Sequence, residues 1–501
     1  MNQMNLPNTS KFLPIITAKN NALMILLFWA LGLKLFHFIG LAEGDDLYYT
    51  ELANRVANGN FEAHFIFDVR WLVFYPTALL YKLFGTNDIT SLLMPTLASM
   101  LSIFFAFRIV ENALDRNHAI VATLIYSSVP VVLIYANILQ VAAFLECCTL
   151  GSIFFLQRAL NNDKWQDYAL CGLFIGLVTM TRITGLFIAP IVAIFLMAMR
   201  GFKLRTILML SLIAAISLIP LVIQGLVFWQ VQGDFLHRLA QSQSVIKFQA
   251  NLDGVDPKDL FFYMRTLFLK EGFANWTYFG LLGYFGIPAA LVAFWYSLAS
   301  RQKAAGFFAI WFIAYFGLMS FTPTSIEPYT TLIRNIRYAI VFVLPLSACL
   351  AWAILQLPTD KLSNKMSIMA KSFIVISIVM THLVLTSNNI EPFHKRQHIQ
   401  KSASTRILSE IGNHKVYLAD KNIDRRLRYY SGYQFNNIRR VKSISQIRGP
   451  GYFLMLKNGY NKQRYRIPKQ EQAKIRRNPS RYGMKYLGDY GYFWVYAVGD
   501  I

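Results

Sequence analysis

Charged residues are scarce in this chain. Only 15% of its 501 residues are Asp, Glu, Lys or Arg, whereas 55% are hydrophobic and 15% are aromatic. Length alone would suggest about three soluble domains. The many long apolar runs override that expectation, because low charge together with such runs is typical of an integral membrane protein.

Cysteines and common catalytic motifs are scarce as well. The cysteines lie inside apolar stretches, so we expect small buried hydrophobic residues rather than disulfides or a metal site. They are Cys147, Cys148, Cys171 and Cys349. No CxxC, HExxH or Walker-type glycine loop is present, so several soluble-enzyme chemistries lack their usual signature. His64, His237 and His382 show no metal-ligand spacing.

Negative charge is the scarcer sign. The chain has 26 acidic residues against 49 lysines and arginines, a formal net charge of +23. Residues 389–501 contribute 23 basic and 7 acidic residues, a net charge of +16. Such a basic region suits anionic lipid head groups or phosphorylated substrates. Nucleic acid is the rival partner, and the predicted topology argues against it.

Eleven apolar stretches are predicted to be membrane helices. They cover about 22–42, 89–109, 119–136, 141–159, 169–181, 185–199, 206–229, 276–299, 306–322, 337–357 and 368–387. The first is longer than the apolar part of a typical signal peptide and is interrupted by Lys34 and His37. We therefore expect an uncleaved helix whose Lys34 extends to the interface.

The segment 71–84 is too short for a crossing, which needs about 20 residues. Pro76 is expected to break it. We predict an interfacial helix anchored by Trp71, Tyr75 and Tyr81.

Basic residues predict the orientation. One set of alternate loops is basic throughout, which identifies the cytoplasmic side. It carries Lys11, Lys19, Arg108, Arg116, Arg158, Lys164, Arg200, Lys203, Arg205, Arg301, Lys303, Lys361, Lys365 and Lys371. The N-terminus is then cytoplasmic, and an odd number of spans places the C-terminal region outside the cytoplasm. We predict a multi-pass protein of the plasma (inner) membrane that does not bind nucleic acid.

The predicted fold class is mainly α. Residues 1–388 would form a polytopic helical bundle, and residues 389–501 a small extracytoplasmic α/β domain. Strands are predicted at Lys415–Ala419, Tyr452–Lys457 and Tyr490–Val498.

Two adjacent carboxylates, Asp45 and Asp46, follow the first apolar run. Residues 46–58 have helical periodicity and end before Gly59, so one aspartate is expected to cap a helix. A cap does not account for the pair, because adjacent like charges raise one pKa and favour a proton acceptor or a metal ligand. At the membrane edge such a pair predicts a functional site.

Two arginines stand beside apolar segments. Arg70 begins the interfacial segment and would either extend to the lipid head groups or grip the phosphate of a lipid carrier. Arg182 breaks an apolar stretch of about 30 residues, where arginine is costly unless it faces water, protein or an anion. It would pair with a carboxylate or, as we favour, hold helices while shaping the site.

Arg334, Arg337 and Tyr338 open the tenth span, after Glu327. They could neutralise a phosphate, or simply anchor the span at the interface.

Two further acidic features receive no catalytic role. Glu146, in the fourth span, is expected to pair with an arginine. The loop 230–275 is long enough to be a lid, but we interpret its acidic residues as a solvated turn before a helix at 261–268. These are Asp253, Asp256 and Asp259.

Four motifs occur in order along residues 20–350. They are GDDLYYTELA, RWLVFYPTALLYKLFG, GLVTMTRITGLFIAP and RYAIVFVLPL. Together they resemble the GT-C superfamily of polytopic glycosyltransferases, and most closely a bacterial branch similar to protein mannosyltransferases and aminoarabinose transferases (glycosyltransferase family 39-like).

The resemblance implies transfer of a sugar from a polyprenyl-phosphate donor to an acceptor on the non-cytoplasmic side. Asp45 would be the general base or would orient the acceptor hydroxyl, and Asp46 would assist. Arg70 would contact the donor phosphate, and Arg337 and Tyr338 would line the same cavity.

This sequence also departs from the family. Arg182 is predicted to bind the donor phosphate because of its position alone. The second acid is Asp46 rather than the commoner Glu. Arg70 replaces a Lys-Pro-Pro pattern, so aminoarabinose is not implied. Gln140 stands near where many relatives have an acid. Relatives differ over metal, so a divalent cation stays open.

The predicted partners are a polyprenyl-phosphate sugar, the bilayer, and a lipid, glycan or protein acceptor. Two alternatives stay open: a lipid-linked sugar transporter or flippase, disfavoured by the acids and by the lack of an evident inverted repeat, and an inactive scaffold.

Overall fold

The structure, a computed structural model, describes most of the chain. The described residues are 21–41, 44–63, 66–241, 262–268, 278–300, 303–326, 329–331, 335–358, 362–418, 421–441, 443–456, 469–490 and 493–499. The residues considered in the sequence that lie outside these ranges include Lys11, Lys19, His64, Asp253, Asp256, Asp259, Arg301, Glu327, Arg334 and Lys361.

The chain divides into two compact units. The first comprises Met1–Phe38, Glu62–Val73 and Pro95–Ile390, and the second comprises Ile39–Phe61, Phe74–Met94 and Glu391–Ile501. Three helices continue from one unit into the other: α3 (Trp71–Phe84), α4 (Asp88–Ala113) and α17 (Asn364–Ile411).

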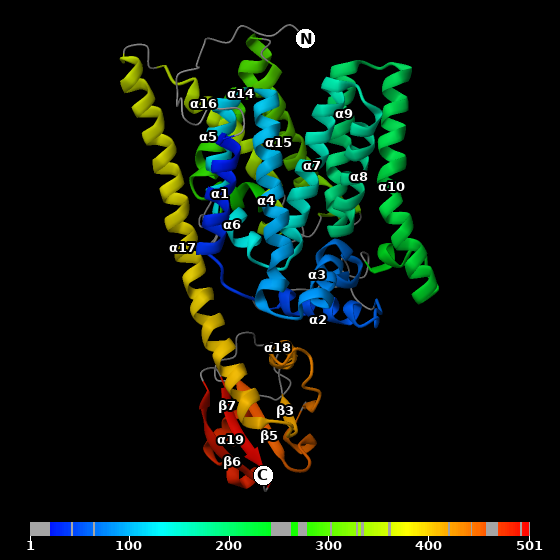
Figure 1. Ribbon diagram of the computed structural model, residues 1–501, viewed down its shortest axis with the longest axis vertical. Helices are drawn as coiled ribbons and strands as arrows, with labels where there is room; N and C mark the ends of the chain where they lie inside the picture. The colour runs from blue at the N-terminus through cyan, green and yellow to red at the C-terminus, as the bar shows by residue number, and fades with distance from the viewer. Residues whose placement is uncertain are drawn as a thin grey trace. The chain divides into compact units, whose positions relative to one another are not determined.

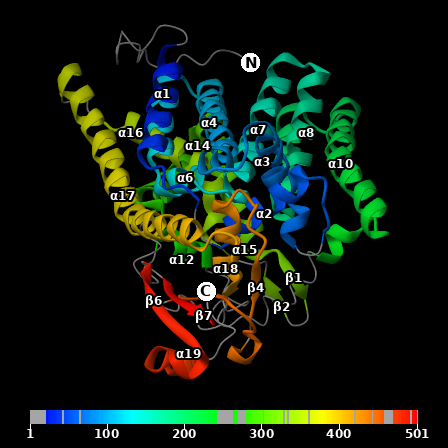
Figure 2. The same ribbon diagram turned by 60° about the horizontal axis from the view of Figure 1, so that its bottom comes forward.

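The first unit is a helical bundle (Figure 1). Its α-helices are α1 (Asn21–Phe36), α5 (Arg116–Ser128), α6 (Pro130–Ala136), α7 (Val141–Asn162), α8 (Trp165–Thr181), α9 (Ile188–Arg200), α10 (Leu204–Gln232), α12 (Phe262–Phe268), α14 (Leu281–Ser300), α15 (Lys303–Phe321) and α16 (Val343–Leu355). Short 3₁₀ helices are η1 (Ile66–Val69), η2 (Ile183–Phe187) and η3 (Ile336–Phe342). A two-stranded hairpin of β1 (Pro323–Ile326) and β2 (Tyr329–Thr331) follows α15 (Figure 2).

The apolar helices make this an integral membrane protein. Within the described residues, 8 helices are long and apolar enough to cross a membrane, and α5 with α6, bent by 63°, would make a ninth. Every one of the predicted apolar stretches contains a helix. However, α1 has 16 residues and α8 has 17, fewer than the roughly 20 that a crossing needs. The predicted count of eleven therefore stays a prediction.

Burial separates central helices from outer ones. In the most apolar part of α7, and of the segment Arg337–Leu355 that ends in α16, 89% of the residues are buried. In the corresponding part of α10 only 17% are buried. Apolar side chains remain exposed along α10, as expected for a surface that faces lipid. Where α8 packs on α10, a Cβ on Gly172 would lie 2.5 Å from the carbonyl oxygen of Ile213, so this close approach requires glycine.

The structure corrects three expectations about the helices. Lys34 does not extend to the interface: it is 1% exposed and its Nζ donates to Ser99 Oγ at 2.8 Å. Glu146, 1% exposed, forms no ion pair with an arginine among the described residues. Pro76 lies inside α3 without ending it, because it occupies the second turn and its missing N–H costs a single bond. Whether α3 lies at the interface stays a prediction.

The second unit contains a five-stranded mixed sheet of order β4-β3-β5-β7-β6. The strands are β3 (Val416–Leu418), β4 (Ile438–Arg440), β5 (Gly451–Leu456), β6 (Met484–Tyr490) and β7 (Phe493–Val498). The helices α2 (Asp45–Ala57), α18 (Lys421–Tyr430) and α19 (Lys469–Arg477) belong to this unit, as do η4 (Ile444–Gln446) and η5 (Pro479–Tyr482).

The strand residues alternate between two cores. Leu454 and Val495 pack with residues at the end of α17 and in α18, whereas Phe453 and Tyr496 pack with Ile475 of α19. This period of two is what the sequence pattern predicts for a sheet covered on both faces. All three predicted strands are present, and the predicted fold class, a helical membrane bundle with a small α/β domain, is confirmed.

Candidate functional site

The two aspartates begin α2. Gly44 precedes them with φ 77°, a conformation that favours glycine, and it occupies the cap position without a side-chain cap bond. The expectation that an aspartate caps the helix is therefore wrong. Asp45 and Asp46 lie in the first turn instead, near the positive end of the helix dipole, and Asp46 is fully buried.

Arg70 lies between η1 and α3 and is buried, at 8% exposed. Its guanidinium carbon is 4.7 Å from the centroid of the Phe67 ring, a cation–π contact. A buried arginine in such a position is fixed in place rather than extended to the head groups.

A second buried arginine, Arg238, was missed by the sequence analysis. It follows α10 and donates to the Gln224 side chain, to the Val69 carbonyl oxygen at 3.2 Å and to the Thr179 carbonyl oxygen. Gln224 also donates to Val69 O, at 2.8 Å. The sequence signal for this cluster was Gln224, a polar residue within the long apolar run of α10.

Arg238 therefore joins the two segments that carry predicted donor-binding arginines. Val69 immediately precedes Arg70, and Thr179 lies in the last turn of α8, which ends just before Arg182. Burial, with a further contribution from the positive charge of Arg70, lowers the pKa of Arg238 to about 10. Arg70 and Arg238 are thus two buried cations, each 8% exposed, whose positive charges influence one another.

Arg182 and Arg337 meet on one aromatic ring. The guanidinium carbon of Arg182 lies 3.3 Å from the centroid of the Tyr338 ring, and that of Arg337 lies 5.3 Å from it. Arg337 also donates from Nη1 to Gln140 Oε1 at 2.8 Å. One partner of Arg337 is thus a neutral amide, Gln140, which immediately precedes α7 and orients the guanidinium.

The predicted site residues fall in both units. Arg70, Arg182, Arg337 and Tyr338 lie in the first unit, whereas Asp45 and Asp46 lie in the second. Their roles remain predictions. Among the described residues, no group of three or more His, Cys, Asp or Glu side chains is placed to hold a metal ion.

Comparison with known proteins decides the fold. Residues 70–224 match the family described as dolichyl-phosphate-mannose-protein mannosyltransferase. ArnT from Cupriavidus metallidurans in the apo state has a similar structure, with a TM-score of 0.65, 12% identity, and coverage of 95% of this chain and 99% of that one. ArnT bound to undecaprenyl phosphate gives a TM-score of 0.66 and 10% identity, covering 97% of this chain and 100% of that one. The chain has the GT-C glycosyltransferase fold.

A more distant structure agrees. The archaeal oligosaccharyltransferase AglB from Archaeoglobus fulgidus, in complex with an inhibitory peptide and a dolichol-phosphate, matches with a TM-score of 0.52 and 12% identity, covering 83% of this chain and 63% of that one. No curated protein matches the sequence. The resemblance to GT-C glycosyltransferases is confirmed. Of the predicted site residues, Arg70 and Arg182 lie inside the matched family segment.

Proposed function

We propose that this protein transfers a sugar from a polyprenyl-phosphate donor to a lipid, polysaccharide or protein acceptor on the non-cytoplasmic face of the plasma (inner) membrane. The observation that carries the proposal is the set of arginines in a GT-C fold: Arg70 and Arg238 are buried, and Arg182 and Arg337 are half-buried on the Tyr338 ring. Neighbouring structures hold undecaprenyl phosphate and dolichol-phosphate, which supports a lipid phosphate as the anion. The N-terminus would be cytoplasmic and residues 389–501 extracytoplasmic.

The arginines would act on the leaving group. As the bond between the anomeric carbon and the phosphate oxygen breaks, negative charge develops on the phosphate. Arg70, Arg182 and Arg337 would stabilise that charge, with Tyr338 stacked to hold the guanidinium planes. Arg238 would contribute a further positive charge and hold the Arg70 and Arg182 segments together.

The carboxylates would act on the acceptor. Asp45 would take the proton of the acceptor hydroxyl as its oxygen forms the new bond to the anomeric carbon. Asp46, buried beside it, would assist by orienting that carboxylate. Donor bond cleavage, acceptor bond formation and proton transfer then balance, with polyprenyl phosphate and the glycosylated acceptor as products.

The test is sugar transfer in proteoliposomes from labelled polyprenyl-phosphate sugars, screened with lipid, glycan and peptide acceptors. Asp45→Asn should lower kcat at least 100-fold, since positioned acid–base groups contribute about 10²–10⁴-fold. Asp489→Asn, an exposed aspartate of β6, is the matched control and should transfer normally. Movement of the lipid-linked sugar across the bilayer without transfer would support a flippase instead. Full transfer by Asp45→Asn would remove the assignment of the base.

A further inference from the structure

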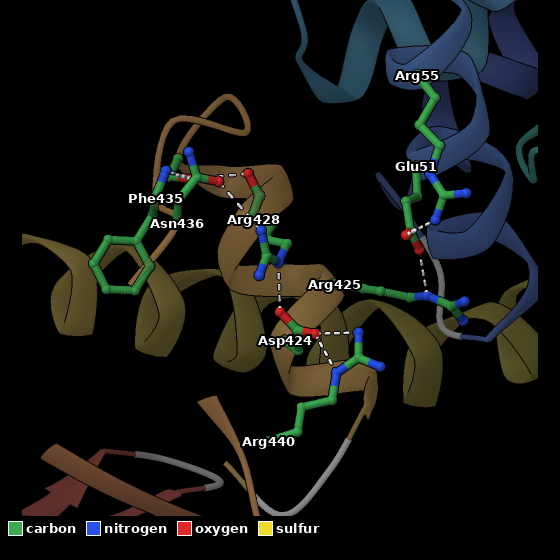
Figure 3. Close-up of polar contacts among 9 residues, drawn as sticks. Glu51, Arg55, Asp424, Arg425, Arg428, Phe435, Asn436 and Arg440 are labelled. Atoms are coloured by element: carbon green, nitrogen blue, oxygen red, sulfur yellow. Dashed lines mark hydrogen bonds and ion pairs between the residues drawn. The ribbon is translucent and has the colours of Figure 1, made fainter. Parts of the chain in front are cut away.

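The helix that carries the two aspartates packs on the C-terminal domain. Arg425 of α18 donates from Nε to Glu51 Oε2 of α2 at 2.7 Å, and Arg55 donates to Glu51 Oε1 at 2.6 Å (Figure 3). The side chains of Arg425 and Glu51 are only 10% and 20% exposed. The guanidinium carbon of Arg425 also lies 4.4 Å from the centroid of the Tyr48 ring. Arg425 therefore contacts two successive turns of α2.

An apolar cluster adds to the contact between α18 and α2. Leu41, Leu47 and Tyr429 form a cluster with at most 2% exposure each, and Tyr433 packs against it. Tyr433 has φ 63°, a left-handed conformation that is rare for a non-glycine residue. The surrounding contacts maintain that conformation, which places the Tyr433 ring against the residues around α2.

The helix α18 is itself fixed to the sheet of its domain. Asp424, 1% exposed, is paired with Arg428 one turn along α18 and with Arg440 of β4 (Figure 3). Removing a partner from such a buried carboxylate is costly, so this connection is firm. The path from sheet to α18 to α2 thus consists of ion pairs in which Asp424 and Arg425 are buried and their partners are half-buried.

The hydroxyl of Tyr429 anchors the same helix at a second place. It is 2.8 Å from Ser91 Oγ and donates to Asp88 Oδ1 at 3.2 Å. Asp88 also forms an ion pair with Lys401 at 2.7 Å. These residues belong to the start of α4 and to α17, so α18 is held from two sides within one unit.

We propose that Arg425 is a positioning residue for the reaction: it holds α2, and so the carboxylates at its start, through Glu51. This inference rests on the proposed function of Asp45. Glu51 is six residues from Asp45, about 9 Å along the helix, so a rotation of α2 at Glu51 moves the carboxylates with it. A displacement of about 1 Å can cost 10²-fold in rate. The C-terminal domain is then required for transfer, while donor binding depends on the arginines of the other unit.

Kinetics of the full-length protein in proteoliposomes test this role. Arg425→Gln should lower kcat 10- to 100-fold and change the donor KM less than about twofold, and Arg425→Lys, which keeps the charge, should recover part of kcat. Arg406→Gln is the control, because Arg406 is exposed and pairs with Glu410 inside the same domain. Unchanged kcat in Arg425→Gln would overturn the proposal, and so would a rise in donor KM with kcat preserved.

Two parallel measurements keep the outcome interpretable. If Asp45→Asn abolishes transfer while Arg425→Gln is normal, the positioning role fails and the proposed function stands. If Asp45→Asn transfers normally, the proposed base fails and the positioning role fails with it. Hydrogen exchange of amides 47–57 gives a readout that needs no substrate: it should accelerate about tenfold in Arg425→Gln and not in Arg406→Gln. Equal exchange in both variants would overturn the proposal.

Discussion

Replacing Arg238 by lysine tests whether a buried guanidinium organises the donor site. Lysine keeps the positive charge beside Arg70. A single ammonium on a flexible stem does not match the planar fork that reaches Val69 O, Gln224 Oε1 and Thr179 O together. Arg238→Lys should therefore lose about two of these three hydrogen bonds.

The expected cost follows from those contacts. A hydrogen bond contributes about 1–1.5 kcal/mol net, so two lost bonds give about 2–3 kcal/mol. That free energy corresponds to a roughly 30- to 150-fold decrease in affinity for the donor phosphate, if the two segments must be joined to bind it. Arg238→Met, which also removes the charge, should weaken binding at least as much.

Binding of polyprenyl phosphate to purified protein in detergent, measured by calorimetry, gives the affinity directly. Arg205→Lys is the control, because Arg205 is 69% exposed and pairs with Asp163 elsewhere in the bundle. Thermal unfolding of each variant shows whether the protein remains folded. Wild-type affinity in a folded Arg238→Lys variant would refute the reasoning, because the charge alone would then suffice.

Three further predictions concern single contacts. Lys34→Met removes the buried hydrogen bond that Lys34 Nζ donates to Ser99 Oγ and should destabilise the protein by about 1–3 kcal/mol in thermal unfolding; an unchanged melting temperature would contradict a stabilising role for this contact. Gln140→Glu keeps a hydrogen-bond acceptor for Arg337 and adds a negative charge that offsets the positive charge of Arg337. The donor KM should then rise on the order of tenfold with the melting temperature preserved. An unchanged KM would mean that Gln140 is only structural. Burial tends to raise the pKa of the Glu51 carboxyl, but Arg425 and the neighbouring Arg55 together lower it below its ordinary value. The ionised Glu51 therefore stabilises the fold fully above about pH 5, and this stabilisation is lost as pH falls through the lowered pKa. Glu51→Gln should flatten that part of the stability–pH curve in chemical unfolding; identical curves would contradict the ion pair.

Local sequence patterns were sufficient to predict the helices and strands. The apolar runs predict the helices because a helix in lipid satisfies its own backbone, so length and composition decide it. The alternation in β7 predicts its strand, because each successive side chain faces the opposite core. Turn chemistry also carried information: Gly59 follows the end of α2 with φ 75°. The expectation that Pro76 breaks the segment 71–84 was wrong. Proline disfavours a helix, but α3 continues through Pro76.

The resemblance directed attention to Asp45, Arg70 and Arg337, but it did not identify what holds them. Arg238 and Gln224 carry no recognisable motif, and their importance follows only from bonds to Val69 and Thr179. A carbonyl oxygen has no sequence signature, so no inspection of residue types finds such an acceptor.

By itself the sequence determined a helical membrane bundle, a small α/β domain, and a pair of acids followed by scattered basic residues. Only the tertiary structure decided the partners. Lys34 meets Ser99 rather than water, and Glu51 meets Arg425 at a separation of 374 residues. The physical reason is that periodicity records how deeply a side chain is buried, whereas an ion pair or hydrogen bond also depends on which distant segment folding brings within about 3 Å.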